Sequence, residues 1–236
     1  MTATDEAFPP GIVGVVANDS ARFSMFSASL SGLEMPQGTQ VKWRIGYHEM
    51  SAQWNEIAKI MLAEPWAQWL WLLGDDHAFA PGLLMQLLGI ELESGPPDIL
   101  VPLCLTRMPP YRPVIFTGFK EDGKHRAPLD LNEYPRGGVI PIHSAGSGGM
   151  LVRRHVFEHL EPPWFESYSI SPIEMGEDVL FCDKAREAGF SLWADLDSAF
   201  GHCITGIIWP GRTQDGWNYG FTLAGGYNFK MPPVGA

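Results

Sequence analysis

The chain has 236 residues, of which 45% are hydrophobic and 18% charged, and a formal net charge of −11. These values predict a folded globular chain with a sizeable core and exclude an intrinsically disordered one. The longest apolar run, at 66–73, is too short to span a bilayer, and residues 1–10 lack the basic and apolar regions of a signal peptide.

The three cysteines, Cys104, Cys182 and Cys203, are widely spaced, odd in number and without a C-x-x-C pair. Such spacing is typical of reduced thiols in a cytoplasmic protein. We therefore expect a cytoplasmic location and no zinc site built from these thiols.

The charge is unevenly distributed along the chain. Residues 101–160 hold eight basic and five acidic side chains within an otherwise acidic sequence. The total of −11 argues against a large basic surface for nucleic acid. The basic segment is either a solvated loop surface or a contact for an anionic acceptor or a diphosphate.

The first hundred residues alternate between strand and helix patterns. Apolar and β-branched runs predict strands over 11–18, 41–47 and 68–73. Helical spacing of apolar residues, with capping and turn residues at the ends, predicts helices over 20–33, 51–63 and 81–91. The alternation implies a mostly parallel, Rossmann-like sheet flanked by helices. Asn18, His48 and Asp75 each follow a strand, so they should share the rim where such sheets bind ligands.

The second half of the chain is less regular. Its patterns predict strands over 98–103, 139–143, 150–153 and 191–194, and helices over 155–160 and 177–188. Loops with short strands are expected over 106–138, and the tail from 207 has no clear periodicity. No linker separates two domains, so we expect one α/β domain over 1–236.

Asp75, Asp76 and His77 come directly after the strand at 68–73. Carboxylate oxygens and an imidazole nitrogen at a ligand-binding rim suit Mn²⁺ or Mg²⁺, which can bridge the two phosphates of a nucleotide-sugar. Such an ion would neutralise charge on the leaving diphosphate. The alternative is a surface turn in which an aspartate caps the helix at Pro81.

The run at 73–79, with Pro81 and an amphipathic helix after it, resembles the metal-binding turn of GT-A glycosyltransferases. The usual form is Asp-x-Asp. With His77 in third place, the turn resembles the Asp-x-His variant of polypeptide N-acetylgalactosaminyltransferases. The resemblance implies a GT-A fold, with Asp75 and His77 as ligands of Mn²⁺ or Mg²⁺ and Asp75 also close to the ribose. Asp76 occupies the variable middle position and is assigned to cofactor binding with Asp75.

Glu177 and Asp178 begin the helix predicted at 177–188. On their own they are typical of a helix N-terminus, where carboxylates interact favourably with the macrodipole. In their context they resemble the Glu-Asp motif on the acceptor-side helix of the same superfamily. That resemblance implies Asp178 as the base that deprotonates the acceptor hydroxyl, with Glu177 as a positioning group or alternative base.

Three further matches complete the predicted site. His202, in Gly201-His202, resembles the late histidine that supplies the remaining metal ligand, although a lone histidine is more often structural. The run at 144–149 resembles a Gly-rich turn on the acceptor and donor-sugar side, which implies a cofactor-binding part for Gly148 and Gly149. Asn55 matches an asparagine on the helix before the metal turn, and we assign Asn55 and Asn18 to cofactor binding.

These matches cover roughly residues 11–203 and imply a family-2-like GT-A enzyme. The expected activity is a metal-dependent hexosyl transfer from a nucleotide-sugar, with UDP as the default, to an acceptor hydroxyl. The implied halves are a nucleotide-binding part at 1–103 and an acceptor-side part at 104–203, with a tail at 204–236 that can act as a lid.

The chain also resembles short glycosyltransferases of bacteriophages and bacteria, some of which act on hydroxymethylated pyrimidines in DNA. DNA is therefore one acceptor to consider, and the host cytoplasm the location if a phage encodes the chain.

Several alternatives stay open. Asp-x-His resembles a retaining family and Glu-Asp resembles inverting ones, so the stereochemical outcome is not predicted. A nucleotidyltransferase would use a similar sheet, although no Gly-rich basic run follows the first strand. A carbohydrate-binding module could use some of the nine tryptophans. Slow hydrolysis of a nucleotide-sugar would separate a transferase from a binding module.

Overall fold

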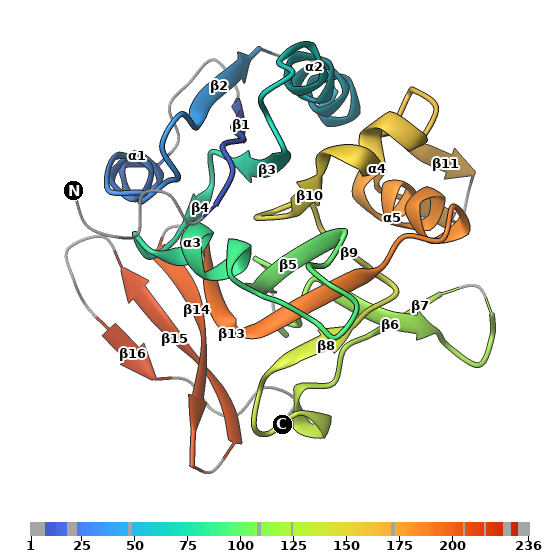
Figure 1. Cartoon of the computed structure of the whole chain (residues 1–236). Helices are drawn as coiled ribbons and strands as arrows, with labels where there is room; N and C mark the ends of the chain where they lie inside the picture. Colours follow the sequence, from blue (N-terminus) through green and yellow to red (C-terminus); the bar gives the residue numbers. More distant parts are fainter. Residues whose placement is uncertain are drawn as a thin grey trace.

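The fold is built on a mixed β-sheet that carries helices on both faces (Figure 1). The computed structural model describes residues 8–17, 23–46, 49–107, 110–123, 125–170, 173–204, 206–214, 216–223 and 228–230. The α/β class expected from the sequence is confirmed.

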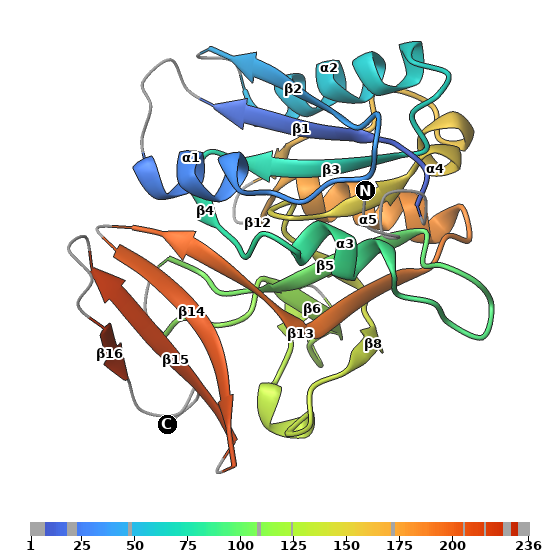
Figure 2. The same cartoon turned by 60° about the vertical axis from the view of Figure 1, so that its left-hand side comes forward.

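Three parallel strands from the first third of the chain form one side of the sheet. They are β1 (Ile12–Ala17), β2 (Gln40–Ile45) and β3 (Trp69–Gly74), with β1 in the middle. All of β1 is buried, as its continuous apolar sequence predicts. Helices α1 (Ser24–Ser31) and α2 (Met50–Ala63) lie in the connections between these strands. Figure 2 shows the three strands side by side, pointing the same way. The predicted alternation of strand and helix is confirmed here.

The sheet continues through strands whose direction the sequence did not specify. β5 (Ile99–Cys104) and β13 (Leu192–Cys203) are parallel to each other. β10 (Leu151–Arg153) lies between β3 and β5 and is antiparallel to both. The sheet is therefore mixed, with parallel core strands, rather than mostly parallel as expected.

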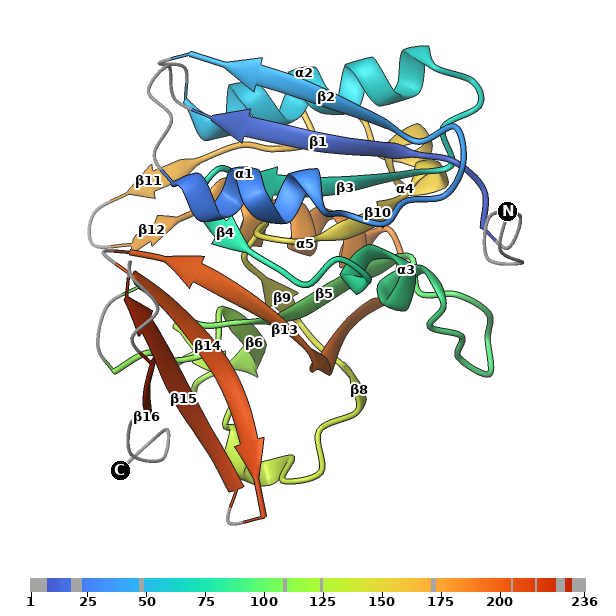
Figure 3. The ribbon, with the colours of Figure 1, turned by 90° about the vertical axis from the view of Figure 1, so that its left-hand side faces the viewer.

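The C-terminal part of the chain extends this sheet with antiparallel strands. β14 (Gly206–Thr213) pairs with the end of β13, and β15 (Gly216–Leu223) and β16 (Asn228–Lys230) follow in order. Figures 2 and 3 show this extension reaching away from the helical layers. Trp217 anchors it, since its ring is 4% exposed and its Nε1 donates to the Tyr134 carbonyl at 2.8 Å. The sequence of the tail, which has no clear periodicity, did not predict these strands, and the lid role stays a prediction.

Two apolar clusters fill the spaces between sheet and helices. One lies under α2, α4 (Arg154–His159) and α5 (Glu177–Glu187) and includes Trp54, Phe157 and Phe181. The other lies under α1 and α3 (Leu83–Leu88). None of the described helices is long and apolar enough to cross a membrane.

Shorter elements complete the fold. They are β4 (His77–Ala78), β6 (Ile115–Phe119), β7 (Arg126–Pro128), the 3-10 turn η1 (Leu131–Glu133), β8 (Val139–Pro141), β9 (Ser144–Ala145), β11 (Tyr168–Ile170) and β12 (Ile173–Met175). Within the described residues, the main sheet runs β16-β15-β14-β13-β5-β10-β3-β1-β2, with β4 and β8 pairing with β13.

Candidate active site

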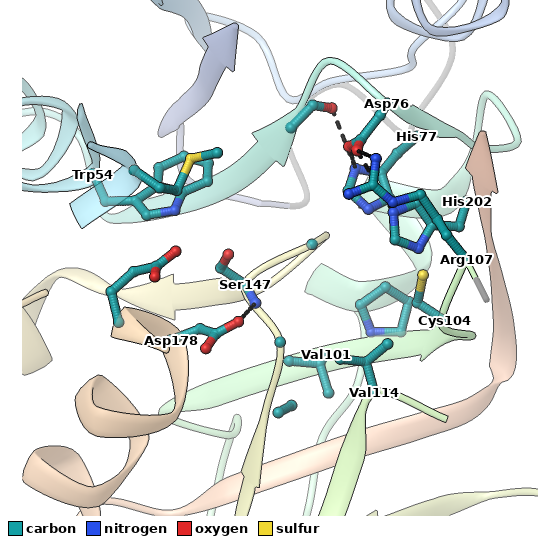
Figure 4. Close-up of a pocket in the computed structure, with 17 residues that line it drawn as sticks. Trp54, Asp76, His77, Val101, Cys104, Arg107, Val114, Ser147, Asp178 and His202 are labelled. Carbon is teal, nitrogen blue, oxygen red and sulfur yellow. Dashed lines mark hydrogen bonds and ion pairs between the residues drawn. The ribbon is translucent and has the colours of Figure 1, made fainter. Parts of the chain in front are cut away.

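A cavity of about 230 Å³ lies at the edge of the sheet where β3 and β5 end (Figure 4). Carboxyl ends of parallel strands are where α/β sheets bind ligands, and this is the rim that the sequence predicted. One end of the cavity is lined by Asp76, His77, Cys104, Arg107 and His202, and the other by Trp54, Ser147 and Asp178. Two sets of chemically active groups therefore face one space.

The two-residue strand β4 brings His77 and His202 together. It pairs antiparallel with β13, in a register that sets His202 opposite His77 and Gly201 opposite Ala78. The imidazole rings stack with centroids 4.9 Å apart and an interplanar angle of 20°. Both histidines named from the sequence therefore reach the same end of the cavity.

Backbone carbonyls hold one nitrogen of each ring. Nδ1 of His202 lies 2.9 Å from the Leu105 carbonyl, and Nδ1 of His77 lies 3.2 Å from the Gly74 carbonyl. A carbonyl can only accept, so each Nδ1 is assigned as a protonated donor, and Nε2 is the nitrogen of each ring that remains for a ligand or an ion. In histidines that ligate metals, the ring nitrogen that does not bind the ion usually donates such a hydrogen bond, which orients the ring.

Cys104 is the third member of this end of the cavity. One ligand atom each from His77, Cys104 and His202 lie within 4.8 Å of one another, a group that can hold a metal ion. His77 and Cys104 are buried, and burial lowers the pKa of His77 to about 4, which leaves its imidazole neutral at pH 7. The expectation that these thiols build no zinc site stays untested, and the fold brings Cys104 into the candidate group. The three cysteines are all described, and none forms a disulfide.

Asp76 adds negative charge beside this group. Its carboxylate lies 3.2 Å from Nδ1 of His77, 3.6 Å from Nε2 of His202 and 3.0 Å from the Arg107 guanidinium. Burial alone would raise the pKa of Asp76, but these three neighbours hold it well below its usual range. Asp76 is therefore an anion at any physiological pH.

Asp75 is a predicted rim residue that the described structure does not place in the cavity lining. Asp75 is described and half-buried, and it lies outside the cavity lining and outside the His77–Cys104–His202 group. Asn18 lies outside the described residues, as does His48. The ligand and ribose roles given to Asp75 stay predictions.

The other end of the cavity is built on the first turn of α5. The Asp178 carboxylate accepts hydrogen bonds from the backbone N–H of Val179 at 2.7 Å and of Ser147 at 3.3 Å. Burial nevertheless raises the pKa of Asp178. Burial also raises the pKa of Glu177, with a further contribution from the charge of Asp178. Both residues line the cavity, so the predicted base and its neighbour face the same space as the histidines.

Gly148 and Gly149 occupy positions that exclude a side chain. A Cβ on Gly148 would lie 2.6 Å from Nε2 of His77, so glycine keeps that nitrogen open toward the cavity. Gly149 has a φ of +78° and its carbonyl accepts a hydrogen bond from Trp71 Nε1 at 2.7 Å. Gly148 lines the cavity, whereas Gly149, also described, lies outside the cavity lining.

Asn55 joins α2 to the segment that follows the cis Pro162-Pro163 bond. Its amide group donates to the carbonyls of Ser51 at 2.8 Å and Phe165 at 2.7 Å. Its oxygen accepts from the N–H groups of Trp164 and Phe165 at 2.8 and 3.2 Å. The side chain is described and is not part of the cavity lining, so its observed role is structural and its cofactor-binding role stays a prediction.

Cys104 and Arg107 are site residues that sequence reasoning did not assign. Cys104 ends a strand that is buried throughout, and nothing in its local sequence marks it as a ligand. Arg107 belongs to the basic segment at 101–160, and this local excess of basic residues is the sequence feature that pointed to an anion contact there. Its partner Asp76 is 31 positions away, so only the folded chain reveals the pair.

Comparisons with known proteins give a likeness of fold. No family model matches the chain, and no curated protein matches its sequence. Among solved structures, one described as the crystal structure of A197 from STIV matches with a TM-score of 0.58 and 11% identity. The match covers 94% of this chain and 98% of that one. Nearly the whole chain therefore shares its fold with A197.

Proposed function

We propose that the chain is a metal-dependent glycosyltransferase that moves a sugar from a nucleotide-sugar, a UDP-sugar by default, to an acceptor hydroxyl. The observation that carries the proposal is a single cavity with a metal-capable group at one end and the buried carboxylate of Asp178 at the other. The GT-A resemblance of both motifs and the fold shared with A197 support it.

In the proposed reaction the acceptor oxygen forms a bond to the anomeric carbon as the bond to the diphosphate oxygen breaks. The hydroxyl proton passes to Asp178, and the diphosphate leaves with the bonding electron pair. A divalent ion bound near His77 and His202 would supply positive charge against the leaving diphosphate. Residues 1–103 are the proposed nucleotide-binding half and residues 104–203 the acceptor-side half.

Asp178 suits the part of the base in two ways. The N–H groups of Val179 and Ser147 fix its carboxylate, so little motion is lost when an acceptor binds. Burial raises its pKa, which makes the ionised form a stronger base than an exposed aspartate. If the enzyme retains configuration, Asp178 orients the acceptor instead.

Among the described residues that line the cavity, Arg107 offers a cation to the donor phosphates. Its side chain is 46% exposed and lines the cavity while it pairs with Asp76. A guanidinium in this position can bind phosphate oxygens with two parallel hydrogen bonds. We assign it to diphosphate binding at the metal-capable end.

The test is release of UDP from a panel of UDP-sugars, with and without acceptors, by the wild type and by Asp178→Asn. The substitution should lower transfer by about 10²–10⁴-fold, the usual contribution of a general base, while UDP still binds. Glu187→Gln is the matched control, because Glu187 is exposed on the same helix. Normal turnover in Asp178→Asn would contradict the base assignment, and no UDP release from any donor would contradict the proposed activity.

The acceptor panel includes hydroxymethylated duplex DNA because residues 101–160 are basic. Part of that charge is already paired within the chain, since Arg107 binds Asp76 and Arg126 binds Asp183. Lys124 lies outside the described residues. Transfer to DNA would identify this acceptor, and salt-insensitive weak binding without transfer would remove it.

A further inference from the structure

We infer that the ion at this site is held by His77, Cys104 and His202 and is Zn²⁺, rather than Mg²⁺ or Mn²⁺. The inference deepens the proposed function and rests on it for what the ion does in catalysis. Binding of the ion itself depends only on the three side chains.

The donor atoms decide which ion fits. Mg²⁺, Ca²⁺ and Mn²⁺ prefer carboxylate, carbonyl and water oxygens, whereas a thiolate with imidazoles is typical of Zn²⁺. The group of ligand atoms within 4.8 Å of one another contains two imidazoles and a thiol. Cys104 is the member that makes the group favour Zn²⁺, because two histidines alone would accept many ions.

The surroundings already orient these donors. The Leu105 carbonyl accepts hydrogen bonds from Nδ1 of His202 at 2.9 Å and from the Cys104 thiol at 3.7 Å. The first contact persists when an ion binds, whereas the thiol gives up its proton to become a ligand. The Gly74 carbonyl holds His77 in the same way at 3.2 Å. These outer contacts leave Nε2 of each ring for an ion, which is the arrangement seen around bound zinc.

The cavity side of the group stays accessible. Three protein donors leave a fourth position of a tetrahedral ion for solvent or a ligand, as in catalytic zinc sites. Asp76, beside the group and paired with Arg107, contributes negative charge that favours a cation there. The three donors all line the cavity.

The experiment is a titration of the chelator-treated full chain with Co²⁺, which replaces Zn²⁺ and reports its ligands by absorption. The wild type should develop a thiolate-to-cobalt charge-transfer band in the near ultraviolet, with intense visible bands of tetrahedral Co²⁺. Added Zn²⁺ should bleach both, and a large excess of Mg²⁺ should not. Absence of the thiolate band in the wild type would overturn the inference.

Cys104→Ser should remove the thiolate band and weaken Zn²⁺ binding by at least about 100-fold, since loss of an outer partner alone costs about 10–100-fold. Cys182→Ser is the matched control, because Cys182 is also a buried free thiol but lies outside the group. A thiolate band that survives in Cys104→Ser would contradict the assignment. Circular dichroism of each variant identifies one that fails to fold, and the wild-type spectrum then decides.

The two proposals can fail separately. A thiolate band without UDP release from any donor would leave the zinc site standing and remove the transferase. Transfer by a wild type that shows no thiolate band would leave the transferase standing and remove the zinc site.

Discussion

At the scale of single residues, Asp178 combines a fixed position with a raised pKa. The ordinary pKa of an aspartate is about 3.9, and burial raises that of Asp178 above its usual value. A base must be ionised to act, so kcat/KM should fall as the pH drops through this raised pKa. The acid limb of the pH profile should therefore lie at higher pH than an ordinary aspartate would give. The acid limb should persist in the Glu177→Gln variant. It should be absent from the residual activity of the Asp178→Asn variant.

The raised pKa of Asp178 should also affect the stability of the folded chain. A carboxyl whose pKa is raised by folding opposes folding at every pH where it is ionised, and this cost disappears as the pH falls through the raised pKa. Asp178→Asn removes the charge and keeps an acceptor for the N–H of Val179. Its Tm at pH 7 should therefore equal or exceed that of the wild type. A clear fall in Tm would show that the ionised carboxylate stabilises the fold.

The sequence predicted part of this site and not the rest, for reasons visible in particular residues. His77 and Asp178 sit in local motifs, and the structure places both in the cavity. Cys104 has no such motif, because its position beside His202 arises only when β5 and β13 pair. Asn55 was assigned to cofactor binding from a resemblance, whereas the hydrogen bonds of its side chain are made within the chain.

At the scale of elements, the site depends on the Gly-rich loop before β10 packing against the turn after β3. Gly148 faces Nε2 of His77, and the His77 ring is itself stacked between Phe200 at 4.6 Å and His202 at 4.9 Å. The His77 ring therefore cannot easily move away from a side chain added at position 148. Gly148→Ala should displace it, weaken Co²⁺ binding by about 10-fold or more and cost about 1–3 kcal/mol of unfolding free energy.

Gly118→Ala is the matched control for that variant, because a Cβ at Gly118 meets nothing within 4 Å. Spectroscopic Co²⁺ titration and urea unfolding measure the two effects. Wild-type Co²⁺ affinity in Gly148→Ala would show that His77 moves freely or does not bind the ion.

Elements differ in how well their sequence predicts them. β1, β3 and α2 have long unbroken patterns, and they were predicted within a few residues. β10 has three residues, too few to reveal that it runs antiparallel between β3 and β5. In β14, Pro210 and Gly211 interrupt the alternation that marks a strand, so the C-terminal extension was missed.

At the scale of the whole molecule, a sheet with helices on both faces leaves its carboxyl-end rim as the place for a ligand. The cavity there, about 230 Å³, is smaller than the ~300–1,000 Å³ typical of small-molecule sites. A nucleotide-sugar would therefore fill it with its diphosphate and sugar and extend onto the adjoining rim. In a chain with a net charge of −11, a local cation such as the Arg107 guanidinium or a bound ion would favour binding of a diphosphate.

Calorimetric titration of UDP into the metal-loaded chain and into the chelator-treated chain tests the central claim most directly. We predict saturable binding to the loaded chain and a Kd at least about 10-fold higher after chelation, because the ion supplies much of the charge that the diphosphate meets. UDP binding that is equally strong without metal, or no binding of UDP at all, would contradict a metal-dependent nucleotide-sugar site at His77 and His202.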